Sequence, residues 1–139
     1  VNALKIATAK VNISFTPALI RGILCNWLVV MALWMSFSAL DVVSKSICCV
    51  IPVSAFVAMG FEHSVANMYF IPLGMFIKAG SPDVVEAAAL APDKLASLTM
   101  SGFWGNIIPV TLGNMAGGIL FVAILYYLVF SGALSLENQ

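Results

Sequence analysis

The stretch GFEHSVANMY, residues 60–69, lies in the middle of the most apolar part of the chain and contains its one histidine, His63. The run SICCVIPVSAFVAM precedes it and the run FIPLGMFI follows it. A straight helix over residues 47–77 would be about 46 Å long, well beyond the ~30 Å hydrocarbon core of a bilayer. Because Gly60 precedes the polar residues and glycine readily ends a helix, the sequence predicts two half-helices separated by a break.

The overall composition places this chain in lipid. Hydrophobic residues make up 62% and charged residues 9% of its 139 residues, against roughly 45–50% and about 25% in soluble domains. The formal net charge is zero and the sequence contains no basic run, so we expect no nucleic-acid partner. The composition therefore predicts an integral membrane protein that has the lipid bilayer as its surroundings.

The hydrophobic pattern predicts an all-α membrane protein, with residues 1–139 forming a single membrane region of three spans. Ser81 and Pro82 are typical of the start of a short surface helix in the connection between the second and third spans. Gly113 and Gly117 have the spacing that allows close helix approach. The expected segments are a span at 18–40, a broken span at 47–77, an extramembrane connection with a short helix at 78–102, a span at 103–130 and a polar tail at 131–139.

His63, Glu62 and Asn67 form the candidate site at the predicted break. Ionisable residues inside membrane segments are costly and usually mark pathways, and non-helical backbone at that depth lines a cavity or is buried in protein. On a helix, His63 and Asn67 would be four residues apart and face the same way. Glu62 would point about 100° away from His63 and would cap or brace the break.

The sequence supports neither an enzyme nor a metal centre. Ser64 adjoins His63 directly, and no third residue is apparent that would orient the pair for nucleophilic catalysis. The three cysteines lie in apolar runs without the spacing of a zinc site. We therefore expect no catalysis, no metal and no cofactor, and interpret Cys25, Cys48 and Cys49 as apolar packing residues.

The remaining role for the break is transport of a small anion. The N-terminus of a half-helix presents free N–H groups and partial positive charge. Moving a bare carboxylate into an apolar medium costs on the order of tens of kcal/mol. Protonating a carboxylate with a pKa near 4 at pH 7 costs only about 4 kcal/mol. We therefore expect a weak-acid anion to pass with the help of a proton exchanged at His63.

The sequences GFEHSVANMYFIPLGM and NIIPVTLGNMAGG resemble the C-terminal half of the formate/nitrite transporter family. The resemblance covers roughly residues 10–130. It implies an aquaporin-like inverted-repeat fold, of which this chain holds only the second repeat. It also implies a channel for small monovalent anions such as formate, nitrite or hydrosulfide. His63 matches the central pore histidine of the family, Glu62 its neighbouring acid and Asn67 the asparagine four positions later.

The same resemblance implies five further pore residues. Asn26 and Asn114 match asparagines that line or brace the pore near the histidine. Phe56 matches an aromatic residue of a constriction, and Val29 an apolar pore-lining position. Lys10 matches a lysine of the outer vestibule, which would attract anions.

The family implies a homopentamer in the prokaryotic inner (cytoplasmic) membrane. It also implies that this chain is a fragment that starts just before the fourth of six spans. Lysine and arginine counts in the loops favour a cytoplasmic location for the N-terminal end. The family topology instead places Lys10 and the connection at 78–102 outside the cell, and we adopt that orientation.

Two other functions stay open at this point. An aquaporin-like channel for water or a neutral solute would have no need of Glu62 and His63. A non-transporting membrane scaffold would associate through Gly113 and Gly117.

Overall fold

The computed structural model describes residues 1–137, with side chains described through residue 132. These residues form helices and no strand, which confirms the all-α prediction. The elements are α1 Asn2–Val11, α2 Phe15–Ser38, α3 Val42–Ala58, α4 Ser64–Gly80, α5 Pro82–Ala88, α6 Pro92–Ala96, α7 Met100–Gly118, the π-helical segment η1 Ile119–Ile124 and α8 Leu125–Glu137.

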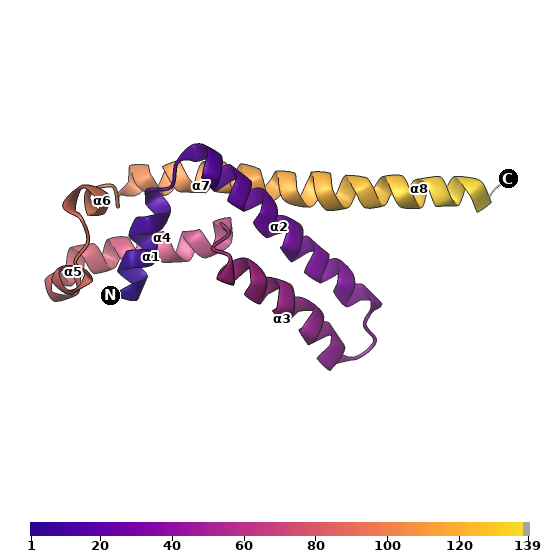
Figure 1. Cartoon of the computed structure of the whole chain (residues 1–139), viewed down its shortest axis with the longest axis horizontal. Coiled ribbons are helices and arrows are strands. Elements are labelled where there is room, and N and C mark those ends of the chain that lie inside the picture. The colour runs from indigo at the N-terminus through magenta and orange to yellow at the C-terminus, as the bar shows by residue number, and fades with distance from the viewer. Residues whose placement is uncertain (138–139) are drawn as a thin grey trace.

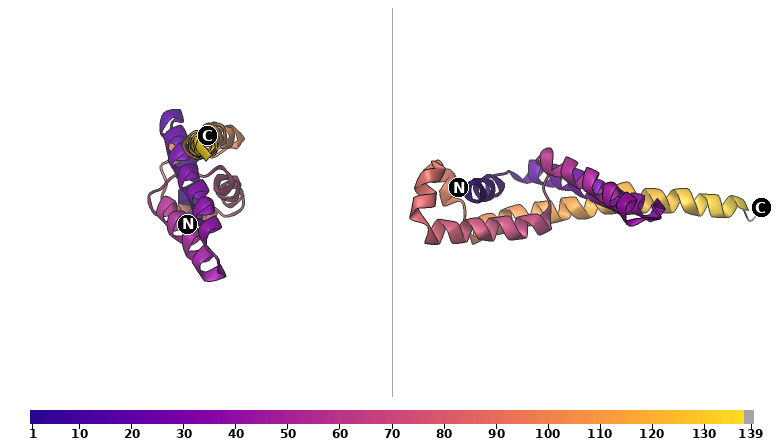
Figure 2. Two further views of the ribbon diagram at one scale, coloured as in Figure 1. Left: turned by 90° about the vertical axis from the view of Figure 1, so that its right-hand side faces the viewer. Right: turned by 90° about the horizontal axis from the view of Figure 1, so that it is seen from below.

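The molecule is elongated along one continuous helix made of α7, η1 and α8 (Figures 1 and 2). Helix α2 packs against α7 and also against the antiparallel α3, while α1 crosses and packs against α4. The short helices α5 and α6 lie at the end of the molecule opposite the C-terminus (Figure 1). The break between α3 and α4 therefore lies near the middle of the bundle, beside α2 and α7.

Helix α1 was not predicted, and it completes the apolar core at the α5–α6 end. Leu4 and Ala7 of α1 are fully buried against Ile71 of α4, together with Ala88 and Leu98 of the connection. A β-carbon added to Gly74 of α4 would clash with the Ala7 side chain, so the two helices are in close contact. This contact holds α1 next to the broken helix.

The helix ends differ from the expected bounds mainly at capping residues and at the C-terminus. Helix α3 begins at Val42 because the Asp41 carboxylate accepts a hydrogen bond from the backbone N–H of Ser44 at 2.9 Å. Hydrogen bonds from the Ser44 side chain and backbone hold the pKa of Asp41 below its usual value. Ser81 occupies the N-cap position of α5 without a side-chain capping bond. The last helix continues to Glu137, although we expected a polar tail from residue 131.

Glycines allow α2 and α7 to approach closely. A β-carbon at Gly113 would clash with the carbonyl oxygen of Leu19, and one at Gly117 with that of Ile23. The close approach predicted for this glycine pair is therefore confirmed, and its partner is α2 of the same chain.

Within the part of the chain that the structure describes, two helical stretches are long and apolar enough to cross a bilayer, Phe15–Ser38 and Met100–Gly132. The second is 33 residues long, which corresponds to about 50 Å at 1.5 Å per residue. Helix α3 is apolar but shorter, and only together with α4 does it reach a spanning length. This arrangement supports a broken middle span between two continuous ones.

Adding one methyl group at Gly113 or Gly105 is expected to have opposite effects on stability. Gly113→Ala should lower the melting temperature in detergent, because overpacking of the α2–α7 contact costs about 1–3 kcal/mol. Gly105→Ala is on the same helix with nothing within 4 Å of the added carbon, and it should stabilise the helix by up to about 1 kcal/mol. Thermal unfolding of the two variants measures the difference, and equal shifts would contradict the close α2–α7 contact.

Candidate functional site

The break is built by a glycine-terminated helix end. Gly60 has a φ of +66°, a backbone conformation that glycine adopts without strain. Its N–H donates to the carbonyl of Val57 at 3.1 Å, and the N–H of Phe61 donates to that of Phe56 at 3.0 Å. This pair of bonds is a Schellman motif, which satisfies the carbonyl groups at the end of α3. The chain then extends through His63 before α4 begins.

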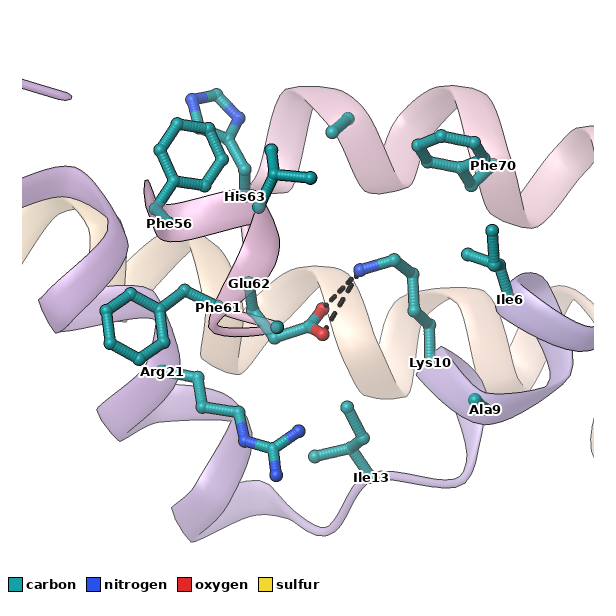
Figure 3. Close-up of a pocket in the computed structure, with 13 residues that line it drawn as sticks. Ile6, Ala9, Lys10, Ile13, Arg21, Phe56, Phe61, Glu62, His63 and Phe70 are labelled. Atoms are coloured by element: carbon teal, nitrogen blue, oxygen red, sulfur yellow. Dashed lines mark hydrogen bonds and ion pairs between the residues drawn. The ribbon is translucent and has the colours of Figure 1, made fainter. Parts of the chain in front are cut away.

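Lys10 and Glu62 form an ion pair at the break, drawn with dashed lines in Figure 3. The Lys10 Nζ atom donates to both carboxylate oxygens of Glu62 at 3.1 Å. The Glu62 side chain is only 3% exposed. A buried carboxylate without a partner is strongly destabilising, so Lys10 compensates a charge that the break places inside the protein. The pair as a whole is electrically neutral.

Asn67 and Asn106 extend this ion pair into α4 and α7. The Asn67 Nδ2 atom donates to Glu62 Oε2 at 2.6 Å and to Asn106 Oδ1 at 2.7 Å. The Asn106 Nδ2 atom in turn donates to the backbone carbonyl of Lys10 at 2.9 Å. The structure therefore brings three of the predicted site residues together, with the Asn67 amide directed to Glu62. Asn106 was not among the predicted site residues, although it is a polar residue in an otherwise apolar helix.

Asn114, on α7, hydrogen-bonds both to the start of α4 and to α2. Its Oδ1 atom accepts hydrogen bonds from both the N–H and the hydroxyl of Ser64 at 3.0 Å. Its Nδ2 atom donates to the carbonyls of Gly22 at 2.8 Å and Glu62 at 3.0 Å. His63, at the N-cap position of α4, makes no side-chain capping bond, so Asn114 takes over the capping role. Asn26 donates to the Asn114 backbone carbonyl at 2.6 Å.

His63 lies at the edge of a cavity of about 360 Å³. Its ring stacks against that of Phe56, with ring centroids 5.9 Å apart and planes inclined by 24°. Its Nδ1 atom is buried and has no hydrogen-bond partner among the described residues. In Figure 3 the imidazole and the Glu62 carboxylate leave the break in opposite directions. The cavity is lined by both of these residues and also by Lys10, Arg21 and Phe56, among mostly apolar side chains.

The predicted site residues thus fall into three groups. His63, Phe56, Glu62 and Lys10 line the cavity. Asn67 and Asn114 are buried behind it and hold the break. Asn26 and Val29 lie on α2 outside this cavity. No group of three histidine, cysteine, aspartate or glutamate residues that could hold a metal ion occurs in the described part of the chain.

This arrangement has clear relatives among known proteins. The sequence profile described as formate/nitrite transporter matches residues 1–128. The chain is 43% identical over 131 residues to the formate channel FocA of Escherichia coli (strain K12), covering 93% of this chain and 46% of FocA. It is 42% identical over 128 residues to a probable formate transporter of Methanothermobacter thermautotrophicus, covering 90% of this chain and 40% of that protein.

The fold agrees with a solved relative described as a pentameric formate channel with formate bound. The TM-score is 0.82 at 39% sequence identity, covering 93% of this chain and 51% of the solved one. The chain therefore spans about half the length of the relatives that it matches. The resemblance inferred from the sequence is confirmed, and the predicted membrane fold with it: the chain belongs to the formate/nitrite transporter family.

Proposed function

We propose that the full-length protein conducts small monovalent weak-acid anions across the membrane, with formate as the first substrate to test. The observation that carries this proposal is the position of His63. Its ring lines a cavity at the N-terminus of a half-helix, with one buried nitrogen free of partners in the described chain. A titratable ring in such a position can give a proton to an anion or accept one from it. Formate channels among the relatives support formate as the substrate.

The step at His63 would be a proton exchange. The imidazolium would donate its proton to the carboxylate oxygen of formate, so that neutral formic acid crosses the apolar part of the path. Phe56 stacks on one face of the ring and keeps that face away from water. An apolar surrounding of this kind favours the neutral pair over a separated ion pair. Nitrite and hydrosulfide are also anions of weak acids, and we include them in the proposed substrate class.

The Lys10–Glu62 pair adds no net charge to the cavity. An isolated Glu62 carboxylate beside His63 would repel an incoming anion. Lys10, bonded to both carboxylate oxygens, cancels that repulsion. We therefore propose that the main role of Lys10 is to neutralise the Glu62 carboxylate, so that an anion can enter the cavity without being repelled.

We also propose a homopentamer in the inner membrane, with the exposed apolar side chains of α2, α3 and α8 facing lipid or neighbouring subunits. The solved relative described as pentameric supports this assembly. The scaffold alternative has less support, because α2 of the same chain already covers Gly113 and Gly117. The water-channel alternative is tested by measuring osmotic water flow in the same vesicles.

His63→Ala is expected to remove the pH dependence of formate uptake and to lower its rate at acidic pH. The physical reason is the loss of the proton donor and acceptor at the cavity. The measurement is uptake of labelled formate and nitrite into proteoliposomes that contain the full-length protein, across a range of pH. Tyr69→Phe, on the exposed face of the same helix, is the matched control. Unchanged flux with an unchanged pH profile in His63→Ala would exclude the proposed role of His63.

Neutralising the two members of the ion pair is expected to shift formate affinity in opposite directions. Lys10→Met leaves Glu62 uncompensated and should raise the apparent KM about tenfold, which corresponds to ~1.4 kcal/mol. Glu62→Gln leaves a net positive charge and should lower the KM. Both shifts should shrink only slightly at high ionic strength, because salt screens buried charges much less than exposed ones.

Lys5→Met is the control for the lysine variant, because Lys5 is on the same helix and exposed to solvent. Initial uptake rates at increasing formate concentrations give the apparent KM of each variant. Shifts of Lys10→Met and Glu62→Gln in the same direction would contradict the proposed charge balance.

A further inference from the structure

Asn106 is a buried polar residue that touches neither the cavity nor the break directly. Asn106 lies on α7, is only 1% exposed and does not line the cavity around His63. A buried amide in an apolar helix is costly unless its donors and acceptor are used. Asn106 uses both ends of its amide, and both contacts are with site residues.

The contacts of Asn106 close a ring of hydrogen bonds. From the Lys10 ammonium the ring runs to the Glu62 carboxylate, then to the Asn67 amide, the Asn106 amide and back to the Lys10 backbone carbonyl. The four residues come from α1, the break, α4 and α7. Helix α1 is therefore held at Lys10 from two sides: by the ammonium on Glu62 and by the carbonyl on Asn106.

The direction of every bond in the ring follows from the Glu62 carboxylate. An ionised carboxylate only accepts hydrogen bonds, so Asn67 must turn its NH₂ group toward it. The second hydrogen of that NH₂ group is donated to Asn106 Oδ1. This orientation leaves the Asn67 Oδ1 atom buried without a partner in the described chain. A flipped Asn67 amide would place its Oδ1 atom against the oxygens of Glu62 and Asn106. The hydrogen bonds of the ring therefore require that Asn67 Oδ1 stays without a partner in the described chain.

Resting on the proposed anion transport, we infer that Asn106 is a positioning residue for Lys10 and thereby sets the affinity for the anion. Asparagine suits the position because its amide accepts from Asn67 and donates to the Lys10 carbonyl at the same time. Aspartate would lose the donor and add a second buried negative charge. Leucine, with the same branched arrangement of side-chain heavy atoms and a somewhat larger volume, would lose both bonds and release the backbone of α1 at Lys10.

The test is a double-mutant cycle between Asn106 and Lys10 in the full-length protein in proteoliposomes. Asn106→Leu alone should raise the apparent KM for formate about fivefold, in the range found for residues of one network. Its maximal uptake rate should stay within about twofold of wild type. In the Lys10→Met background, Asn106→Leu should raise the KM no further, because the charge that it positions is already gone. Additive effects in the double variant would overturn the inference.

Asn12→Ala is the matched control for general loosening of α1. Asn12 also fastens this helix, by donating to the carbonyls of Thr8 and Lys94, but it is outside the ring. Its KM for formate should stay near the wild-type value, and a rise equal to that of Asn106→Leu would overturn the inference. Where Asn106→Leu does not elute as a single species, Asn106→Ala replaces it, since water can enter the smaller side chain's space.

The two proposals fail in different ways. Wild-type protein that transports neither formate nor nitrite would remove the proposed function itself. Wild-type protein that transports formate, with additive effects of the Asn106 and Lys10 variants or with a fall only in maximal rate, would remove the positioning role of Asn106 alone.

Discussion

The constraint behind this structure is that a broken helix surrounded by apolar side chains must satisfy its polar groups inside the protein. At the break the helix ends at Ala58 and helical structure resumes at Ser64. Lipid offers no hydrogen bonds, so every freed N–H and carbonyl needs a partner from another segment. At the end of α3, the positive φ of Gly60 allows neighbouring N–H groups to bond the last carbonyls of the helix. At the start of α4 the partner comes from another helix, because the Asn114 side chain of α7 accepts from the N–H of Ser64.

The same constraint explains why the buried carboxylate of Glu62 occurs with its partners. Glu62 is buried, and its carboxylate is compensated by Lys10 and by the amide of Asn67. His63 is treated differently, because its ring lines the cavity and its Nδ1 atom has no partner among the described residues. The adjacent residues therefore differ in role: Glu62 is held by hydrogen bonds within the protein, whereas the ring of His63 lines the cavity and can take part in proton exchange.

Much of this site was predictable from local sequence, and the part that was not depends on distant contacts. The break and its histidine could be located because Gly60 and the polar residues interrupt an apolar run of excessive length. The pairing of Asn67 was not foreseen: helical spacing directed it to His63, whereas the structure directs it to Glu62. The reason is that a buried carboxylate attracts donors more strongly than an imidazole does, and spacing alone does not measure this. Helix α1 and the part played by Asn106 were missed because their partners lie far along the chain: Asn106 and Lys10 are 96 positions apart.

The two asparagines of α7 have a consequence for how the protein is made. Lys10, Glu62 and Asn67 leave the ribosome before α7 does, and until then the cap of α4 and the donor for the Lys10 carbonyl do not exist. The backbone N–H at the start of α4 and the backbone carbonyl of Lys10 therefore lack these partners until α7 has been made. The last long helix is the element that finishes the site, so a chain released early by a premature stop codon would carry the signature histidine in an unfinished break. Completion of the site accordingly depends on the docking of α7, and synthesis of Lys10, Glu62 and His63 alone does not complete it.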